Sequence, residues 1–195
     1  MADKNLNPMN QKVYDVSDND SPLNYNQMLH QISNRYGQTP DSVTDIMNRI
    51  AYHEAGPSMD PSVSQIGGGP GRGLFQFETG ADAGGMTAMR RLRQYFADSG
   101  EEAPSWTEFN PDEGVDASRL TPEQQKMLFM ANVRYHPTAS LEGITPENLG
   151  ESFWAPSHWA GADKDKDARL RSFNESMAAY NLNNTPTPEE MAFNY

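Results

Sequence analysis

The chain has 195 residues, no cysteine and a formal net charge of −12 at pH 7. A chain of this length suits a single domain with a hydrophobic core. The acidic balance argues against a nucleic-acid-binding surface and against adhesion to an anionic membrane. Without cysteine there are no disulfides and no thiol chemistry. We expect no membrane span, because no apolar stretch is long enough, and the sequence shows no secretory signal.

The first 24 residues are expected to form a flexible or partner-ordered arm. They are rich in Asn, Asp, Pro and Lys and show no hydrophobic periodicity. Such a segment buries too little apolar surface to repay the entropy of ordering itself. A short helix is predicted next, over residues 25–36, so the domain is expected to begin at Tyr25.

A second helix is predicted from Thr39 onward, and it carries an acid on its apolar side. Thr39 is a good N-cap and Pro40 suits the first helical position. Apolar residues recur at helical spacing as far as Ile50, and Glu54 continues that stripe just before Gly56 ends the helix. Partial desolvation there favours the protonated carboxyl, which suits a general acid. The alternative is an ordinary solvated Glu in the last turn, since Glu is mostly exposed.

A glycine-rich loop follows and ends in the tetrapeptide GLFQ, residues 73–76. Five of the seven residues 67–73 are glycine, which lets the backbone approach a ligand or a neighbouring element closely. No Lys-Ser or Lys-Thr follows, so a phosphate-binding loop is not expected. His53 and Glu54 do not begin an H-E-x-x-H zinc site, because Pro57 stands where the second His would be. The sequence therefore predicts neither a metal nor a cofactor.

Glu54, the glycine loop and the string GRGLFQFE together resemble the signature of the lytic transglycosylase and goose-type lysozyme superfamily. The resemblance implies that Glu54 is the general acid and that Gln76, with Phe75 beside it, lines the sugar-binding cleft. It also implies a mainly α-helical, lysozyme-like domain with a short irregular or β segment after the catalytic helix. The implied reaction is cleavage of the β-1,4 bond between N-acetylmuramic acid and N-acetylglucosamine in peptidoglycan glycan strands.

Two departures keep a second enzymatic interpretation open. Ala55 follows Glu54 where many transglycosylases have Ser, and the interval from Glu54 to Gln76 is 22 residues, as in goose-type lysozymes rather than many transglycosylases. In those lysozymes a second acid two residues after the Gln helps position water, and Glu78 stands there. An inverting muramidase needs such a carboxylate, whereas a transglycosylase does not. Asp82 is a weaker candidate, and both acids are alternatively solvated loop carboxylates.

The second half of the chain is predicted to contain four helices separated by loops. One is marked by the apolar residues from Met86 to Phe96, and a long loop then runs to residue 120. Thr121 opens a capping box for a helix that ends near Tyr135. A shorter helix is predicted over residues 145–154, and the final helix over residues 170–181. Tyr135 is a candidate to face the cleft, although an aromatic at helical spacing is more often in the core.

An aromatic cluster occupies residues 153–161 and includes Trp154, His158 and Trp159. Aromatic faces and polar donors gathered in one place suit a glycan cleft. The segment resembles the aromatic-x-Ala-Gly element that closes the cleft opposite the acid in this superfamily, which makes His158 and Trp159 substrate-binding candidates. The alternative is that the Trp side chains fill the core and His158 caps a turn.

The two ends of the chain are predicted to bind partners. The tail, residues 182–195, is polar except for Met191, Phe193 and Tyr195, which alternate as in an added strand or docking peptide, unless the tail is simply loose. The strings GRGLFQFE and HWAG resemble phage-borne, virion-associated members most closely. This implies a virion protein that acts at the host cell wall or periplasm and binds other virion proteins or further copies of itself. A third interpretation is a structural internal-core or tail-hub protein whose lytic domain is secondary or inactive.

Overall fold

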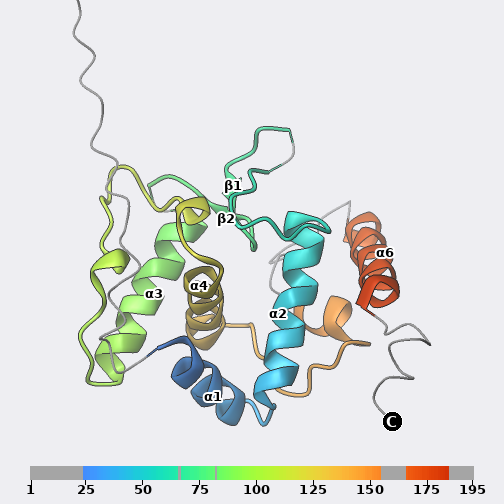
Figure 1. Cartoon of the computed structure of the whole chain (residues 1–195), viewed down its shortest axis with the longest axis horizontal. Helices are drawn as coiled ribbons and strands as arrows, with labels where there is room; N and C mark the ends of the chain where they lie inside the picture. The colour runs from blue at the N-terminus through green and yellow to red at the C-terminus, as the bar shows by residue number, and fades with distance from the viewer. Residues whose placement is uncertain (1–23, 66, 82, 155–165, 185–195) are drawn as a thin grey trace, which may run out of the picture.

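The computed structural model describes residues 24–65, 67–81, 83–154 and 166–184, and these form a mainly helical domain with one small β-hairpin (Figure 1). The predicted helical class and the short β segment after the second helix are thereby confirmed. The longer helices are α1 (Tyr25–Arg35), α2 (Pro40–Ala55), α3 (Gly84–Asp98), α4 (Pro122–Tyr135) and α6 (Lys166–Asn184). The shorter elements are β1 (Gly71–Arg72), β2 (Phe77–Glu78), the 3-10 turns η1 (Ser105–Thr107) and η2 (Ala117–Arg119), and the π-type turn η3 (Gly150–Trp154).

The helix starts follow from local capping chemistry. Thr39 accepts a hydrogen bond from the Ser42 N–H at 3.1 Å and Pro40 occupies the first helical position, as predicted. Thr121 and Gln124 form the predicted reciprocal capping box at the start of α4. Each cap satisfies backbone N–H groups that the first turn of a helix leaves without an intrahelical acceptor.

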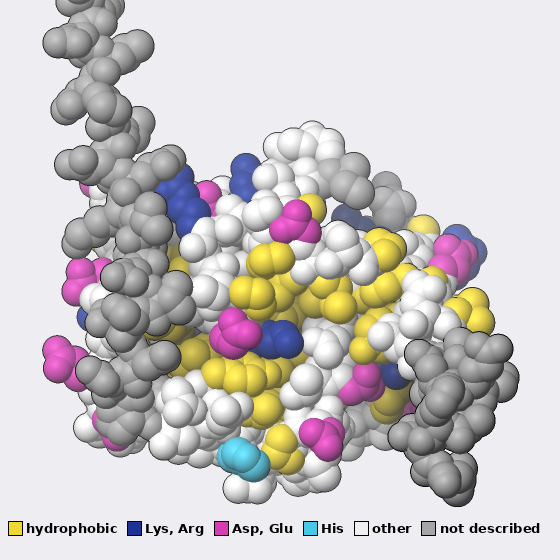
Figure 2. All heavy atoms as spheres, in the orientation of Figure 1, with side chains coloured by type: hydrophobic (Ala, Val, Ile, Leu, Met, Phe, Trp, Pro, Cys, Tyr) yellow, Lys and Arg dark blue, Asp and Glu magenta, His cyan; other side chains and the backbone are white. Residues whose placement is uncertain are grey.

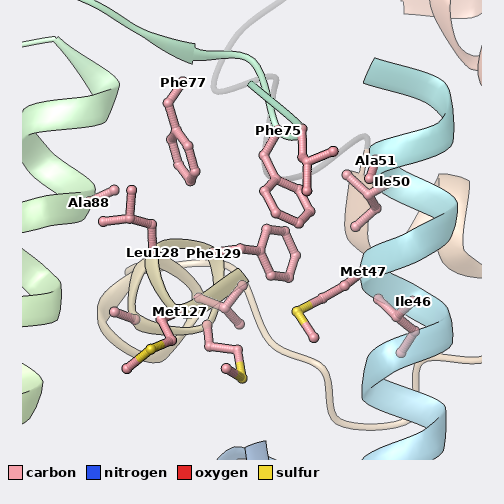
Figure 3. Packing of buried hydrophobic residues seen from close by; sticks show 14 of the residues in the cluster. Ile46, Met47, Ile50, Ala51, Phe75, Phe77, Ala88, Met127, Leu128 and Phe129 are labelled. Atoms are coloured by element: carbon pink, nitrogen blue, oxygen red, sulfur yellow. The ribbon is translucent and has the colours of Figure 1, made fainter. Parts of the chain in front are cut away.

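The core lies between α2, α3 and α4, with α1 packed beneath them and α6 against the outer side of α2 (Figure 1). Figure 3 shows Ile46, Met47 and Ile50 on the side of α2 that faces α4, with Phe129 of α4 between the two helices and Leu128 on the side of Ala88 of α3. Phe75 and Phe77 cover this layer from the hairpin side. All of these side chains are buried, so the apolar stripe that predicted α2 is the stripe that holds it in place.

The GLFQ tetrapeptide forms the turn between β1 and β2. The strands are antiparallel, with Gly71 opposite Glu78 and Arg72 opposite Phe77. Gly73 has φ +75°, and a Cβ built there would lie 2.3 Å from the Gln125 Oε1 atom. Glycine is therefore required at position 73 both by the left-handed backbone and by the close approach of Gln125.

Gln125 on α4 fixes this turn to the helical body. It is fully buried, its Oε1 accepts the Leu74 N–H at 2.7 Å, and its Nε2 donates to the carbonyls of Pro61 at 2.9 Å and Leu120 at 3.0 Å. One amide thus satisfies three backbone groups from three separate segments. The turn that carries Phe75 and Gln76 is held by this amide as well as by apolar packing.

Two element boundaries differ from the sequence-based prediction. Residues 145–148 form a turn, because the Asn148 side chain accepts the Thr145 N–H at 2.8 Å and donates to the Gly143 carbonyl, leaving only η3 in a helical conformation. The last helix continues through residues 182–184, which were assigned to the tail. Asn183 and Asn184 extend it, since their side chains bond the Tyr52 hydroxyl at 2.9 Å and a carbonyl one turn back at 2.8 Å.

Among the described residues, no helix combines the length and the hydropathy that a membrane crossing requires.

Candidate functional site

A groove with a volume of about 370 Å³ lies between the end of α2, the hairpin and the end of α4. Four of the residues singled out from the sequence line it: Glu54, Phe75, Gln76 and Glu78. Its buried floor is aromatic, formed by Phe75, Phe129 and Phe153. Figure 2 shows hydrophobic side chains gathered below the hairpin, over α4 and α2, with few charged groups among them.

Glu54 stands half-buried in the last turn of α2. Its Oε1 atom accepts a hydrogen bond from the indole N–H of Trp154 at 2.8 Å, across 100 residues of sequence. Trp154 is only 5% exposed, and its ring stacks on Phe173 of α6 with centroids 4.8 Å apart. The sequence favoured Trp159 over Trp154 as a site residue, yet Trp154 is the one that contacts the predicted acid.

Gln76 adopts a left-handed backbone conformation with φ +48°, which is uncommon for a non-glycine residue. Its Nε2 donates to the Gly73 carbonyl at 2.8 Å, which closes the turn. Its Oε1 atom is buried and has no hydrogen-bond partner among the described residues. A buried acceptor without a donor costs about 1–3 kcal/mol, so a donor from water or a ligand that reached this oxygen would stabilise the protein.

Glu78 is exposed on β2 and lines the same groove as Glu54. The structure thus brings two carboxyl groups to one groove, one half-buried and one in solvent. Within the described part of the chain, no cluster of three or more His, Asp and Glu side chains is arranged to hold a metal ion.

Asn132 and His136 also line the groove, and the sequence did not single them out. His136 Nδ1 accepts the backbone N–H groups of Thr138 at 3.2 Å and Ala139 at 3.1 Å, so its neutral form carries the proton on Nε2. A signal for both residues exists in the sequence. Phe129, Asn132 and His136 follow one another at spacings of three and four, which places them on one face of α4.

Tyr135 does not lie in this groove. It lines a separate pocket of about 250 Å³ formed by α1, α3 and α4, and its hydroxyl donates to Asp98 Oδ2 at 2.6 Å. Burial, and then the hydrogen bond to Asp98, raise the pKa of Tyr135 to about 12. Successive residues of an α-helix are rotated by about 100°, so Tyr135 points away from the face that presents His136 to the groove.

The remaining candidates, Asp82, His158 and Trp159, lie outside the described residues. Their part in the site stays a prediction from the sequence.

Comparison with the models of known protein families, with curated proteins and with solved structures gives no match for this chain.

Proposed function

We propose that the protein is a peptidoglycan lytic transglycosylase with a lysozyme-like domain and that Glu54 is its general acid and base. The observation that carries the proposal is the placement of Glu54, half-buried and held by Trp154, at the same groove as Gln76 and Glu78. The likeness of the string GRGLFQFE to the superfamily signature supports the same assignment. An aromatic floor suits sugar rings, which present apolar faces as well as hydroxyl edges.

The proposed reaction begins when Glu54 transfers its proton to the glycosidic oxygen that leaves with N-acetylglucosamine. The bond from muramic acid C1 to that oxygen breaks through an oxocarbenium-like transition state. The C6 hydroxyl of the same muramic acid then attacks C1, and the Glu54 carboxylate takes its proton. The products are a 1,6-anhydromuramic end and a free N-acetylglucosamine end, and the acid is regenerated.

The second candidate function is an inverting muramidase, and the presence of Glu78 at the groove favours it. In that reaction Glu78 removes a proton from water while Glu54 protonates the leaving oxygen. The two reactions share the acid and differ in the nucleophile, so their products identify them.

Mass spectrometry of muropeptides after digestion of purified peptidoglycan tests both reactions. A transglycosylase leaves 1,6-anhydromuramic ends, and a muramidase leaves reducing muramic ends. Glu54→Gln, purified in the same way, should give neither product. If the wild-type digest contains reducing muramic ends and the Glu78→Gln digest does not, the protein is a muramidase and the transglycosylase proposal fails. If the wild-type protein makes no new ends at all, both enzymatic proposals fail and the structural interpretation is favoured.

We place the protein in a phage particle that acts at the host cell wall or periplasm, with other virion proteins bound through residues 1–24 and through the tail beyond α6. The composition of the two ends and the likeness to virion-associated members support this. A chain shortened to residues 24–184 should cleave isolated peptidoglycan at a near-normal rate but should not be incorporated into particles. Normal incorporation of the shortened chain would contradict the role of the two ends.

A further inference from the structure

We propose that Trp154 is a positioning residue for Glu54 and that it decides which carboxyl oxygen carries the proton donated in catalysis. The inference rests on the proposed function, since it assigns a role within the same site. Its basis is the hydrogen bond from the indole Nε1–H to Glu54 Oε1 and the packing that holds the indole in place.

The direction of this hydrogen bond has a chemical consequence. An indole N–H is a donor only, so Oε1 must be the acceptor at 2.8 Å. In a neutral carboxylic acid the carbonyl oxygen accepts hydrogen bonds better than the hydroxyl oxygen does. The protonated form of Glu54 therefore keeps Oε1 as the carbonyl oxygen and carries its proton on Oε2. Trp154 thus selects one of the two proton positions and fixes the plane of the carboxyl group.

Trp154 is itself held by two rings from different helices. Its ring stacks on Phe173 of α6 with an interplanar angle of 25°, and the His53 ring meets it edge-on with centroids 5.0 Å apart. The short turn η3 that carries Trp154 also packs closely on α6. A Cβ built on Gly150 would lie 3.0 Å from the Phe173 ring and 3.0 Å from Asn174 Oδ1.

Helix α6 also contacts α2, the helix that carries Glu54. Ser176 Oγ lies 3.0 Å from Nδ1 of His53, the residue directly before Glu54, and Asn183 donates to the Tyr52 hydroxyl at 2.9 Å. Figure 1 shows α6 outside α2, at the edge of the domain. The peripheral helix therefore contacts both the helix that carries the acid and the turn that carries its donor. Support of this kind, from residues behind the reacting group, is what holds a catalytic side chain in a productive geometry.

The pairing is tested by the indole N–H signals in a proton–nitrogen NMR spectrum of the full chain. The protein has three tryptophans, and the signal of Trp154 is the one missing from Trp154→Phe. The chemical shift of this signal should change as the Glu54 carboxyl loses its proton. The part of the change that is due to Glu54 should be absent from Glu54→Gln. His53, Glu78 and His136 are further ionisable groups on the elements around the groove, and any contribution from them persists in that variant. A Trp154 signal with the same pH dependence in the wild type and in Glu54→Gln would overturn the pairing of Trp154 with Glu54.

The positioning role is tested by the cleavage rate of Trp154→Phe, which removes the donor but keeps an aromatic ring against Phe173. The rate should fall about tenfold, as for loss of one hydrogen bond to a charged group. The fall should appear in kcat with KM little changed, because Trp154 is not among the residues that line the groove. The matched control is Trp106→Phe, at a half-buried tryptophan outside the groove, and it should change the rate less than about twofold.

An unchanged kcat in Trp154→Phe would overturn the positioning role even if the wild type cleaves peptidoglycan. The thermal midpoint of Trp154→Phe should stay within about 4 °C of the wild type. A larger drop, with no Glu54-dependent change in the Trp154 indole signal, would assign Trp154 to the core alone. If the wild type does not cleave peptidoglycan, the proposed function fails, while the indole titration still decides whether Trp154 and Glu54 are paired.

Discussion

Two pockets of this protein are each lined by a carboxylate that accepts a hydrogen bond from an aromatic side chain, and they differ in what surrounds that carboxylate. The half-buried Glu54 lines the groove and accepts a hydrogen bond at 2.8 Å from Trp154, which lies behind the groove lining. In the pocket between α1, α3 and α4, Tyr135 donates to the exposed Asp98 at 2.6 Å. The two contacts use the same chemistry, so the contact alone does not identify a catalytic acid.

The surroundings of Asp98 make it a poor proton donor. Tyr135 donates to one of its oxygens, and Gln94 donates to the other at 2.6 Å. These two hydrogen bonds, that from Tyr135 first, lower the pKa of Asp98 below its usual value, so it is ionised at neutral pH. Glu54 instead is half-buried in a larger groove with a buried aromatic lining. The comparison teaches that burial of the carboxyl group, rather than an aromatic partner, distinguishes the candidate acid.

The largest effect is expected from removing each acid in turn. Glu54→Gln should lower the rate of peptidoglycan cleavage by about 100-fold or more, because a general acid contributes at least that much. The matched change Asp98→Asn should alter the rate less than about twofold, since Asp98 lies in the other pocket. Dye release from labelled peptidoglycan measures both, with circular dichroism as the folding control. Comparable losses in the two variants would remove the distinction between the pockets.

A smaller effect is expected on stability, from the residue that holds the hairpin turn of the groove to α4. Gln125→Leu keeps a similar volume but leaves the Leu74 N–H and the Pro61 and Leu120 carbonyls without their partner. We expect the free energy of unfolding to fall by about 2–3 kcal/mol, the usual cost of buried polar groups left unsatisfied. Urea denaturation measures the change.

The neighbouring Gln124→Leu is the control for this change. It removes only the side-chain acceptor of the Thr121 N–H in the capping box, so the expected loss is about 1 kcal/mol or less. Equal losses in the two variants would show that Gln125 does not hold the turn. The titration of Tyr135 should be the same in both variants, because neither glutamine lines its pocket.

The smallest effect concerns Tyr135 and should leave activity unchanged. Its pKa is raised to about 12 from the usual 10.0, so this hydroxyl stabilises the folded state at pH below 10, and that contribution is lost as the pH rises toward 12. Phenolate absorbance should therefore show a tyrosine that ionises near pH 12 and is missing from Tyr135→Phe. Asp98→Asn should shift this ionisation to lower pH. Ionisation near pH 10 in the wild type would show that the Tyr135–Asp98 pair does not form in solution.

The sequence by itself determined the elements whose signals are local. Thr39 and Pro40 set the start of α2, the capping box at Thr121 sets the start of α4, and the apolar stripe puts Glu54 on the core side of its helix. The glycines before residue 76 marked a close backbone approach, which Gly73 makes with Gln125. Caps, helical periodicity and glycine conformation act within one or two turns, so they are readable without knowing how the helices pack.

Only the tertiary structure decided which distant residues complete the groove. The contact of Trp154 with Glu54 spans 100 residues, and that of Gln125 with Leu74 spans 51. The choice of His136 over Tyr135 depends on how the last residue of α4 and the C-cap that follows it are directed, which has meaning only once the neighbours of that helix are fixed. A local pattern states which face of a helix is apolar. The segment that packs against this face is decided by the packing of the whole core. All the elements of the core contribute to the free energy of these contacts together.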